Sequence, residues 1–250
     1  MKPWNLVFAL AAALACATPA QAQVPPTAAE TAAYQGLHAA AARGDVPKLT
    51  QLIAARADVN ARDGYGRTPL HVATFARQAD AIRALAQAGA DLNALENDRY
   101  DAVTIAAVAD DEATLRVLLK LGASAQQVTS RYDGTALIAA AHLGHDGVVR
   151  QLITAGAPLD HVNNLHWTAL IESIVLGNGG PRHQSTLQAL LKAGAAVSLA
   201  GTLKVSTWQA KDGTTRPALD LVADEVASTT PRPRKRNEQP VSQSGGDQFA

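Results

Sequence analysis

The chain has 250 residues, with 22 basic side chains, 22 acidic side chains and one cysteine. The balanced charge excludes a general nucleic-acid binder, which needs a basic excess to neutralise phosphates. The single cysteine excludes a disulfide scaffold and a cysteine-based zinc cluster. Hydrophobic residues make up 47% of the chain, so it is too apolar to be disordered throughout.

Residues 1–22 have the pattern of a cleaved export signal. Lys2 precedes the apolar run Leu6–Ala17, and the small-x-small triplet Ala20-Gln21-Ala22 follows it. The run is shorter than the ~20 residues that span a bilayer as a helix, so we expect no membrane span. The sequence therefore predicts a periplasmic protein, with lipoprotein processing at Cys16 as the alternative.

After an expected linker at 23–33, a unit of about 33 residues recurs along the chain. Leu37-His38-Ala39-Ala40 returns 33 residues later as Leu70-His71-Val72-Ala73. Helical patterns follow one another, and a glycine comes after the last turn of several of them. These Gly-Ala pairs recur at nearly regular spacing: Gly89-Ala90, Gly122-Ala123, Gly156-Ala157 and Gly194-Ala195. Such recurrence predicts stacked helical units.

The segment Gly66-Arg67-Thr68-Pro69-Leu70-His71-Val72-Ala73 resembles the G-x-T-P-L-H-x-A motif of ankyrin repeats. Thr68 suits the N-cap of a helix, and Pro69 suits its first turn. We interpret His71 as a hydrogen-bonding residue at the helix start and not as a catalytic or metal-binding group. The resemblance implies an all-α ankyrin solenoid of five to six helix-turn-helix units with β-turn fingers.

We place the repeat domain at residues 34–227. The repeats are expected at 34–62, 63–96, 97–129, 130–162 and 163–199, with a truncated sixth at 200–227. Two insertions break the period. Residues Gly177–His183 lengthen the inter-helix loop of the fifth repeat, and the alternating stretch within 197–213 predicts an extended β-hairpin finger. The tail at 228–250 is rich in Pro, Ser, Gln and Gly and is expected to be disordered, with its basic run Arg232–Arg236 solvated.

The sequence contains no nucleophile motif, phosphate loop or HExxH pair, so we expect no enzyme and no cofactor. His142 and His145 stand three residues apart, a spacing that can hold a metal ion. They fall in the turn between two helices, where ankyrin repeats commonly have Gly-His. We therefore interpret them as structural and expect no metal site.

A denser polar region follows, from His161 to His183. Its Trp-Thr-Ala-Leu-Ile-Glu and Gly-Gly-Pro-Arg-His segments resemble a signature of a subgroup of exported proteobacterial ankyrin proteins, although His166 stands where glycine is more usual. Glu172 would be costly if buried alone, so Arg182 or His183 is its expected partner. The region is an internal polar bridge, a contact for a binding partner, or a small-molecule or metal site that also uses His161.

The fingers are expected to form the binding surface, because Tyr, Trp and Arg are enriched at protein–protein hot spots. The alternative is that the tyrosines stiffen the stack by packing on neighbouring fingers. We predict a monomeric, non-enzymatic protein–protein interaction module in the bacterial envelope, which binds an unknown protein partner through its fingers and concave face. A secreted effector acting on a host protein is a further alternative. The candidate partner-binding residues are Tyr65, Arg99, Tyr100, Arg131, Tyr132, His166, Trp167, Glu172, Arg182 and His183.

Overall fold

The computed structural model describes residues 23–196, 198–209 and 215–227. The expected export signal and the expected tail lie outside these described residues. Within them, no helix is both long enough and apolar enough to cross a membrane.

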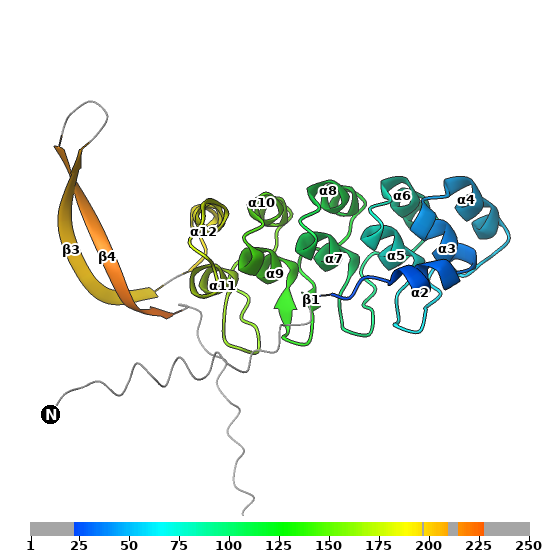
Figure 1. Ribbon diagram of the computed structural model, residues 1–250, viewed down its shortest axis with the longest axis horizontal. Coiled ribbons are helices and arrows are strands. Elements are labelled where there is room, and N and C mark those ends of the chain that lie inside the picture. The colour runs from blue at the N-terminus through cyan, green and yellow to red at the C-terminus, as the bar shows by residue number, and fades with distance from the viewer. Residues whose placement is uncertain (1–22, 197, 210–214, 228–250) are drawn as a thin grey trace, which may run out of the picture.

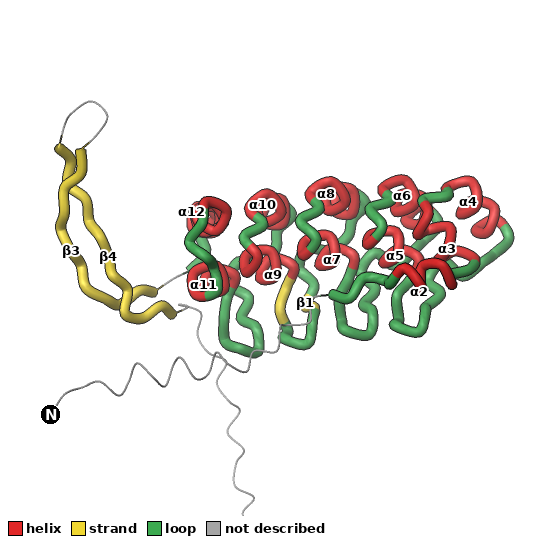
Figure 2. The backbone as a smooth tube through the Cα atoms, viewed as in Figure 1, coloured by secondary structure: helices red, strands yellow, loops and turns green. Residues whose placement is uncertain are grey.

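Five pairs of antiparallel helices stack along one axis. Figure 1 shows them in two layers, with the first helix of each pair on the side of the loops and the second helix on the opposite side. The loops between pairs project as fingers along one edge, and the short strands β1 and β2 belong to one of them (Figure 2). This arrangement confirms the expected helical solenoid. The elements are α3 (Gly36–Arg43), α4 (Val46–Ala54), α5 (Pro69–Phe75), α6 (Ala79–Gln87), α7 (Ala102–Val108), α8 (Glu112–Lys120), β1 (Val128–Thr129), β2 (Gly134–Thr135), α9 (Ala136–Leu143), α10 (Asp146–Thr154), α11 (Ala169–Val175) and α12 (Pro181–Ala193).

Side-chain caps start the first helix of most pairs. The hydroxyls of Thr68, Thr135 and Thr168 each accept a hydrogen bond from a backbone N–H of the first helical turn, which would otherwise lack a partner. In the degenerate third repeat Asp101 takes this place and accepts from the N–H of Thr104 at 2.7 Å. Burial raises the pKa of the Asp101 carboxyl, because the site is closed to water.

His71 is a structural residue. Its Nδ1 accepts from the backbone N–H of Thr68 at 3.0 Å, so the proton is on Nε2, which lies 3.0 Å from the carbonyl of Ala94 and 3.2 Å from that of Tyr100. The imidazole thus ties its own helix to the next finger. Burial lowers the pKa of His71 to about 4 despite these carbonyl acceptors, so the ring is neutral at pH 7.

Leucines at corresponding positions form the core. On the second helices these are Leu85, Leu118, Leu152 and Leu190, and all four are fully buried; in the first unit the fully buried leucine is Leu49, one turn earlier in the helix. Each buried leucine side chain contributes about 1.5–3 kcal/mol. The remaining space is filled largely by alanines of the first helices, whose small side chains let neighbouring units approach closely. A unit cannot close this core without its neighbours.

The expected linker contains a helix, α2 (Ala28–Ala33). It starts with a capping box in which Thr27 and Glu30 exchange side-chain and backbone hydrogen bonds. Glu30 also bonds Arg67 at 3.3 Å, and the hydroxyl of Tyr34 donates to Asp63 at 2.7 Å. The Thr-x-x-Glu spacing could have predicted this helix from the sequence.

The fifth unit differs from the expected one in how it absorbs its extra residues. The insertion was expected to lengthen the loop through His183, but α12 already begins at Pro181 and has 13 residues, against nine in α10. Proline at the first helical position is favourable because its missing N–H needs no acceptor there. Part of the insertion therefore extends a helix, and Arg182 and His183 lie in its first turn.

The expected truncated sixth repeat is replaced by a β-hairpin. Strand β3 (Ser198–Gln209) pairs antiparallel with β4 (Thr215–Ala227), where Leu203 is opposite Leu221 and Val205 is opposite Leu219. The extended hairpin finger is therefore present, but its second strand uses residues that were assigned to a helical unit. The alternating pattern of residues 202–208 supplies β4 with a strand to pair with.

Candidate functional site: the finger edge and the histidine–arginine junction

Each finger is shaped by one polar side chain at its base. The carboxylate of Asp63 accepts from the backbone N–H groups of Tyr65 and Arg67, at 2.9 and 2.8 Å. Asn163 does the same for Leu165 and Trp167, both at 3.0 Å. Such short side chains form tight turns because they reach their own backbone two residues on. The backbone of each of these fingers is therefore held in one turn conformation.

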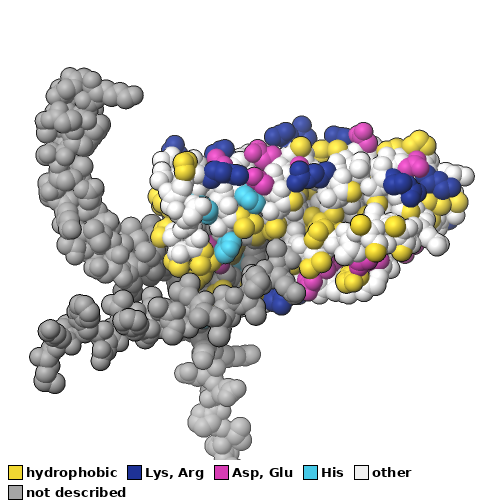
Figure 3. Space-filling model, in the orientation of Figure 1, with side chains coloured by type: hydrophobic (Ala, Val, Ile, Leu, Met, Phe, Trp, Pro, Cys, Tyr) yellow, Lys and Arg dark blue, Asp and Glu magenta, His cyan; other side chains and the backbone are white. Residues whose placement is uncertain are grey.

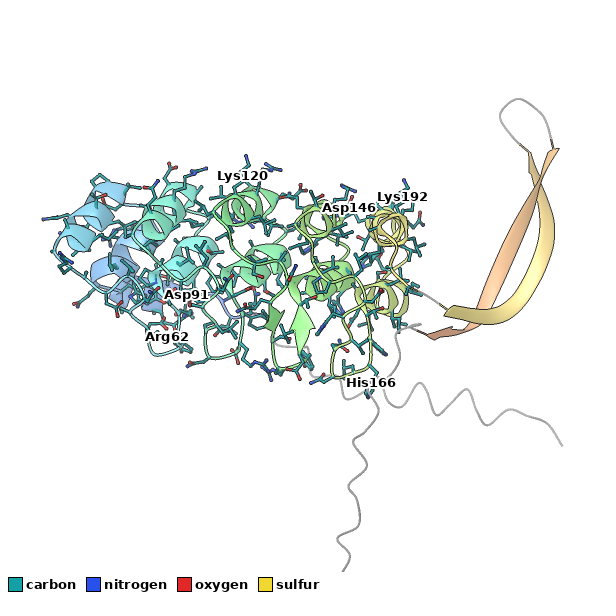
Figure 4. All side chains as sticks on the ribbon, turned by 180° about the vertical axis from the view of Figure 1, so that it is seen from behind. Arg62, Asp91, Lys120, Asp146, His166 and Lys192 are labelled. Atoms are coloured by element: carbon teal, nitrogen blue, oxygen red, sulfur yellow. The ribbon has the colours of Figure 1, made fainter. Side chains whose placement is uncertain are left out.

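Neighbouring fingers are joined by backbone hydrogen bonds near their tips. The carbonyl of Tyr65 accepts from Asn97 at 3.0 Å, and the carbonyl of Tyr132 accepts from Asn164 at 2.9 Å. Between these two junctions the carbonyl of Arg99 accepts from the N–H of the next finger at 2.8 Å. The finger tips consequently form one connected edge, which we call the finger edge. Figure 4 shows Arg62 and His166 on this edge, and Lys120, Asp146 and Lys192 on the side of the second helices.

The three finger tyrosines differ in exposure. Tyr65 is 54% exposed, and its ring packs on the Arg67 guanidinium. The distance from Arg67 Cζ to the centre of the ring is 4.3 Å. The Glu30 carboxylate acts on the Tyr65 hydroxyl and raises its pKa. Tyr132 is 36% exposed, whereas Tyr100 is half-buried. Tyr65 thus has intramolecular contacts, and Tyr132 offers more free surface than Tyr100.

Arginines alternate with acidic residues across adjacent fingers. Arg99 bonds Asp133 at 2.8 Å, and Arg131 lies 3.8 Å from Asp98. All four side chains are about half exposed. Ion pairs in this setting contribute only about 0–1 kcal/mol. A protein partner could exchange them at little cost.

The last finger carries His166 and Trp167. His166 is exposed and has a backbone φ of +64°, a conformation that is costly for most residues other than glycine. This agrees with glycine being the usual residue at the position. Trp167 is half-buried, and its backbone is anchored on Asn163.

Glu172 is an internal residue, and its expected partners were wrong. It is 5% exposed, and its carboxylate accepts from Asn163 Nδ2 at 3.0 Å and contacts His142 Nδ1 at 2.9 Å. Neither Arg182 nor His183 bonds it. The carboxylate instead joins the base of the last finger to the end of α9. Of the interpretations left open for this region, the internal polar bridge is the one that fits Glu172.

Arg182 and His183 bind to the two preceding units. Arg182 reaches Asp110 with contacts of 2.9 and 2.7 Å and Asp146 at 3.4 Å, so one side chain connects the third, fourth and fifth units. Burial disfavours the charged form of Asp146. The hydrogen bonds and positive charges of Arg150 and Arg182 have the larger effect, and they lower the pKa of Asp146. His183 Nε2 donates to the carbonyl of His142 at 3.0 Å.

We call the resulting cluster the histidine–arginine junction. Figure 3 shows histidine side chains grouped toward the C-terminal end of the solenoid, beside arginine and acidic side chains. His145 takes part through Nδ1, which lies 2.9 Å from the carbonyl of Ala107. The junction comprises Asp110, His142, His145, Asp146, Glu172, Arg182 and His183.

The residues considered for a metal or small-molecule site have separate partners. His161 Nε2 lies 2.6 Å from the carbonyl of Asp133. Glu172 and Arg182 bond different residues, His142 and Asp110. Within the described part of the chain, no three His, Cys, Asp or Glu side chains are grouped so that they could hold a metal ion. Two open depressions lie elsewhere, between α8 and α10 and between α10 and α12.

Sequence reasoning singled out Glu172, Arg182 and His183 but missed their partners. Asp110 and Asp146 stand at the inter-helix turns of the third and fourth units, and Asn163 stands at the base of the fifth finger. Aligning the units by their period would have placed Asp110 and Asp146 beside the turn that contains Arg182. Nothing in the sequence indicates that one arginine reaches back 72 residues.

Comparison with known proteins agrees with this architecture. A family model for ankyrin repeats in three copies matches residues 37–129, and one for a single ankyrin repeat matches residues 132–164. An ankyrin repeat protein of Escherichia coli (strain K12), YahD, is 33% identical over 161 residues, which are 64% of this chain and 80% of the relative. The crystal structure of an ankyrin repeat domain from Acinetobacter baumannii AYE is 43% identical and has a TM-score of 0.61. That match covers 72% of this chain and 86% of the other.

Proposed function

Because the chain belongs to the ankyrin repeat family, whose members are generally non-enzymatic protein–protein interaction scaffolds, we propose that it binds a protein partner through the finger edge and the adjoining face of the first helices. The observation that carries the proposal is the connected row of finger tips, which holds exposed Arg99, Arg131, Tyr132 and His166 at fixed spacing. A rigid surface loses little conformational entropy on binding.

The proposal narrows the set of contact residues. Arg99, Arg131, Tyr132, His166 and Trp167 belong to the binding surface. Tyr65 and Tyr100 contribute at its margin, because the Tyr65 ring already packs on Arg67 of its own finger and Tyr100 is half-buried. Glu172, Arg182 and His183 are not contact residues in this proposal. Their polar groups bond other parts of the solenoid and hold the units together.

We place the protein in the bacterial envelope as a monomer. The support is the export pattern of residues 1–22 and the similarity of the Trp-Thr-Ala-Leu-Ile-Glu and Gly-Gly-Pro-Arg-His segments to an exported proteobacterial subgroup. Fractionation of a strain with the tagged protein tests the location. Recovery in the periplasmic fraction is expected, whereas recovery mainly in the medium would favour a secreted effector and recovery with membranes would favour lipidation at Cys16.

Partner binding is tested by crosslinking in cells. A photoreactive amino acid at Tyr132 should capture a specific protein, and the same amino acid at Arg116, on the exposed surface of α8, should not. The triple change Arg131→Ala, Tyr132→Ala and His166→Ala should abolish capture from a finger position that is left intact, such as Arg99. Thermal unfolding must show that this variant is folded. Equal capture from Tyr132 and Arg116 would remove the finger edge as the binding site.

A further inference from the structure

The two ends of the solenoid are closed differently. At the N-terminal end, α2 and Tyr34 cover the first unit with a polar network through Glu30 and Asp63. At the C-terminal end, Ile174 of α11 is 38% exposed and Leu191 of α12 is 46% exposed. Terminal units of repeat proteins need a polar outer face to stay soluble. We call this apolar surface of α11 and α12 the end face.

Ile174 occupies a repeat position that is closed in every preceding unit. Each of those units is followed by another helix pair, whereas the fifth unit is followed by the hairpin. The exposure of Ile174 therefore marks the place where the first helix of a further unit would pack. The equivalent residues, at intervals of 33 or 34, are at most 3% exposed: Ala41, Thr74, Ala107 and Ala141.

The hairpin that follows the fifth unit is itself an incomplete sheet. Strands β3 and β4 pair only with each other among the described residues, and Figure 1 shows the hairpin extending away from α12. A two-stranded ribbon is at best marginally stable in water without a further strand or a packed face. Strand β4 also contains Pro217, which cannot donate a backbone hydrogen bond. In the part of the chain that the structure describes, the end face thus exposes apolar side chains that no further unit covers, and β4 pairs with one strand only.

The sequence of β4 repeats the start of a first helix. Residues Pro217-Ala218-Leu219 correspond to Thr68-Pro69-Leu70, Thr135-Ala136-Leu137 and Thr168-Ala169-Leu170, the segments that open α5, α9 and α11. The leucine of all three helices is 0–1% exposed. In this alignment Leu219 is the core residue, and Ala223 falls at the position of Ile174.

We propose that the end face is a docking surface for residues 217–223 of this same chain, which leave β4 and form the first helix of a sixth unit against α11. Docking buries Ile174 as its equivalents are buried and continues the interface that already joins the five units. The hairpin and the docked helix are two arrangements of one segment. The hairpin pairs the backbone of β3 but leaves Ile174 exposed, whereas the docked helix covers Ile174 and leaves β3 without its partner strand.

Thiol labelling of the full chain tests this inference, in a background with Cys16→Ser. Ile174→Cys reports on the end face, and cysteine fits there because the equivalent residues are Ala and Thr. Val175→Cys is the matched control, since Val175 is 52% exposed and its equivalents Phe75, Val108 and His142 are not buried. If the helix is docked in about 90% of molecules, the thiol at 174 reacts about tenfold more slowly than the thiol at 175, because only the undocked state reacts.

Two further substitutions separate docking from shielding by the hairpin. Leu219→Asp removes the proposed core residue and should raise the labelling rate of Ile174→Cys to that of Val175→Cys. Leu203→Asp changes a β3 residue opposite Leu221, so it weakens the hairpin and leaves the protection of position 174 intact or increased. Loss of protection with both substitutions would overturn the inference, because the hairpin itself would then be the cover.

Backbone chemical shifts give an independent readout on the unlabelled protein. Residues 218–223 should show the downfield Cα shifts of a helix, and these should disappear with Leu219→Asp. Strand-like shifts together with equal labelling of the two thiols would refute the docked helix. Protection that fades on dilution would also refute it, because a second copy of the chain would then cover the end face.

Discussion

Replacing Glu172 with alanine should destabilise the fifth unit without changing its shape. The carboxylate is buried and bonds Asn163 Nδ2 and His142 Nδ1. The side chain of His142 is 43% exposed, so water can replace the bond to it, whereas the buried amide of Asn163 would lose its acceptor. A hydrogen bond to a charged group contributes about 1.5–3 kcal/mol, and we expect a loss of this size in the free energy of unfolding.

The chain supplies its own controls for this change. Position 172 corresponds to Ala139 in the fourth unit, so alanine fits at this point of the helix without strain. Glu172→Gln keeps an acceptor for Asn163 and should cost less than about 1 kcal/mol, because only the charge is removed. Equilibrium urea unfolding, monitored by circular dichroism, measures the stability of both variants. The dependence of the unfolding free energy on urea concentration should equal that of the parent.

The pairing with Asn163 can be isolated by a double-mutant cycle. Asn163→Ala and Glu172→Ala remove the same bond, so their combined effect should be smaller than the sum of the single effects. Additive losses, or a Glu172→Ala variant within about 0.5 kcal/mol of the parent, would refute the assignment of Glu172 as an internal bridge.

Three other changes test the stack, the junction and the buried histidine. Leu152→Ala should cost about 2–5 kcal/mol in urea unfolding, because the leucine is fully buried; a loss like that of an exposed residue would contradict the core. Gly144→Ala should cost about 1–2 kcal/mol, because Gly144 has a φ of +70°, and a methyl group there would also displace the His183 ring. His71 has a folded pKa of about 4, below its ordinary value of 6.5, so its contribution is complete above pH 6.5 and is lost as the pH falls toward 4. The parent should therefore lose about 2 kcal/mol more than His71→Asn between pH 7 and pH 4.5, and equal pH dependences would show that His71 is not buried in its neutral form.

Local patterns in the sequence predicted most of the solenoid. The period of about 33 residues located the five helix pairs because the units place similar residues at the same positions, such as the capping threonine and the leucine two residues later in the second, fourth and fifth units. Helix α2 was missed although its capping box, Thr27 to Glu30, is also local. These features are predictable because the interactions that form them span only a few residues.

The tertiary structure decided which polar groups meet across units. Glu172 bonds His142, which is 30 residues away, and Arg182 bonds Asp110, which is 72 residues away; these pairings follow from the stacking of units and not from local spacing. The segment at 217–223 shows the same limit, because its helix-like sequence lies in a strand that pairs with β3. Sequence patterns fix local preferences, whereas pairing over long range depends on which neighbours the packed units place within reach.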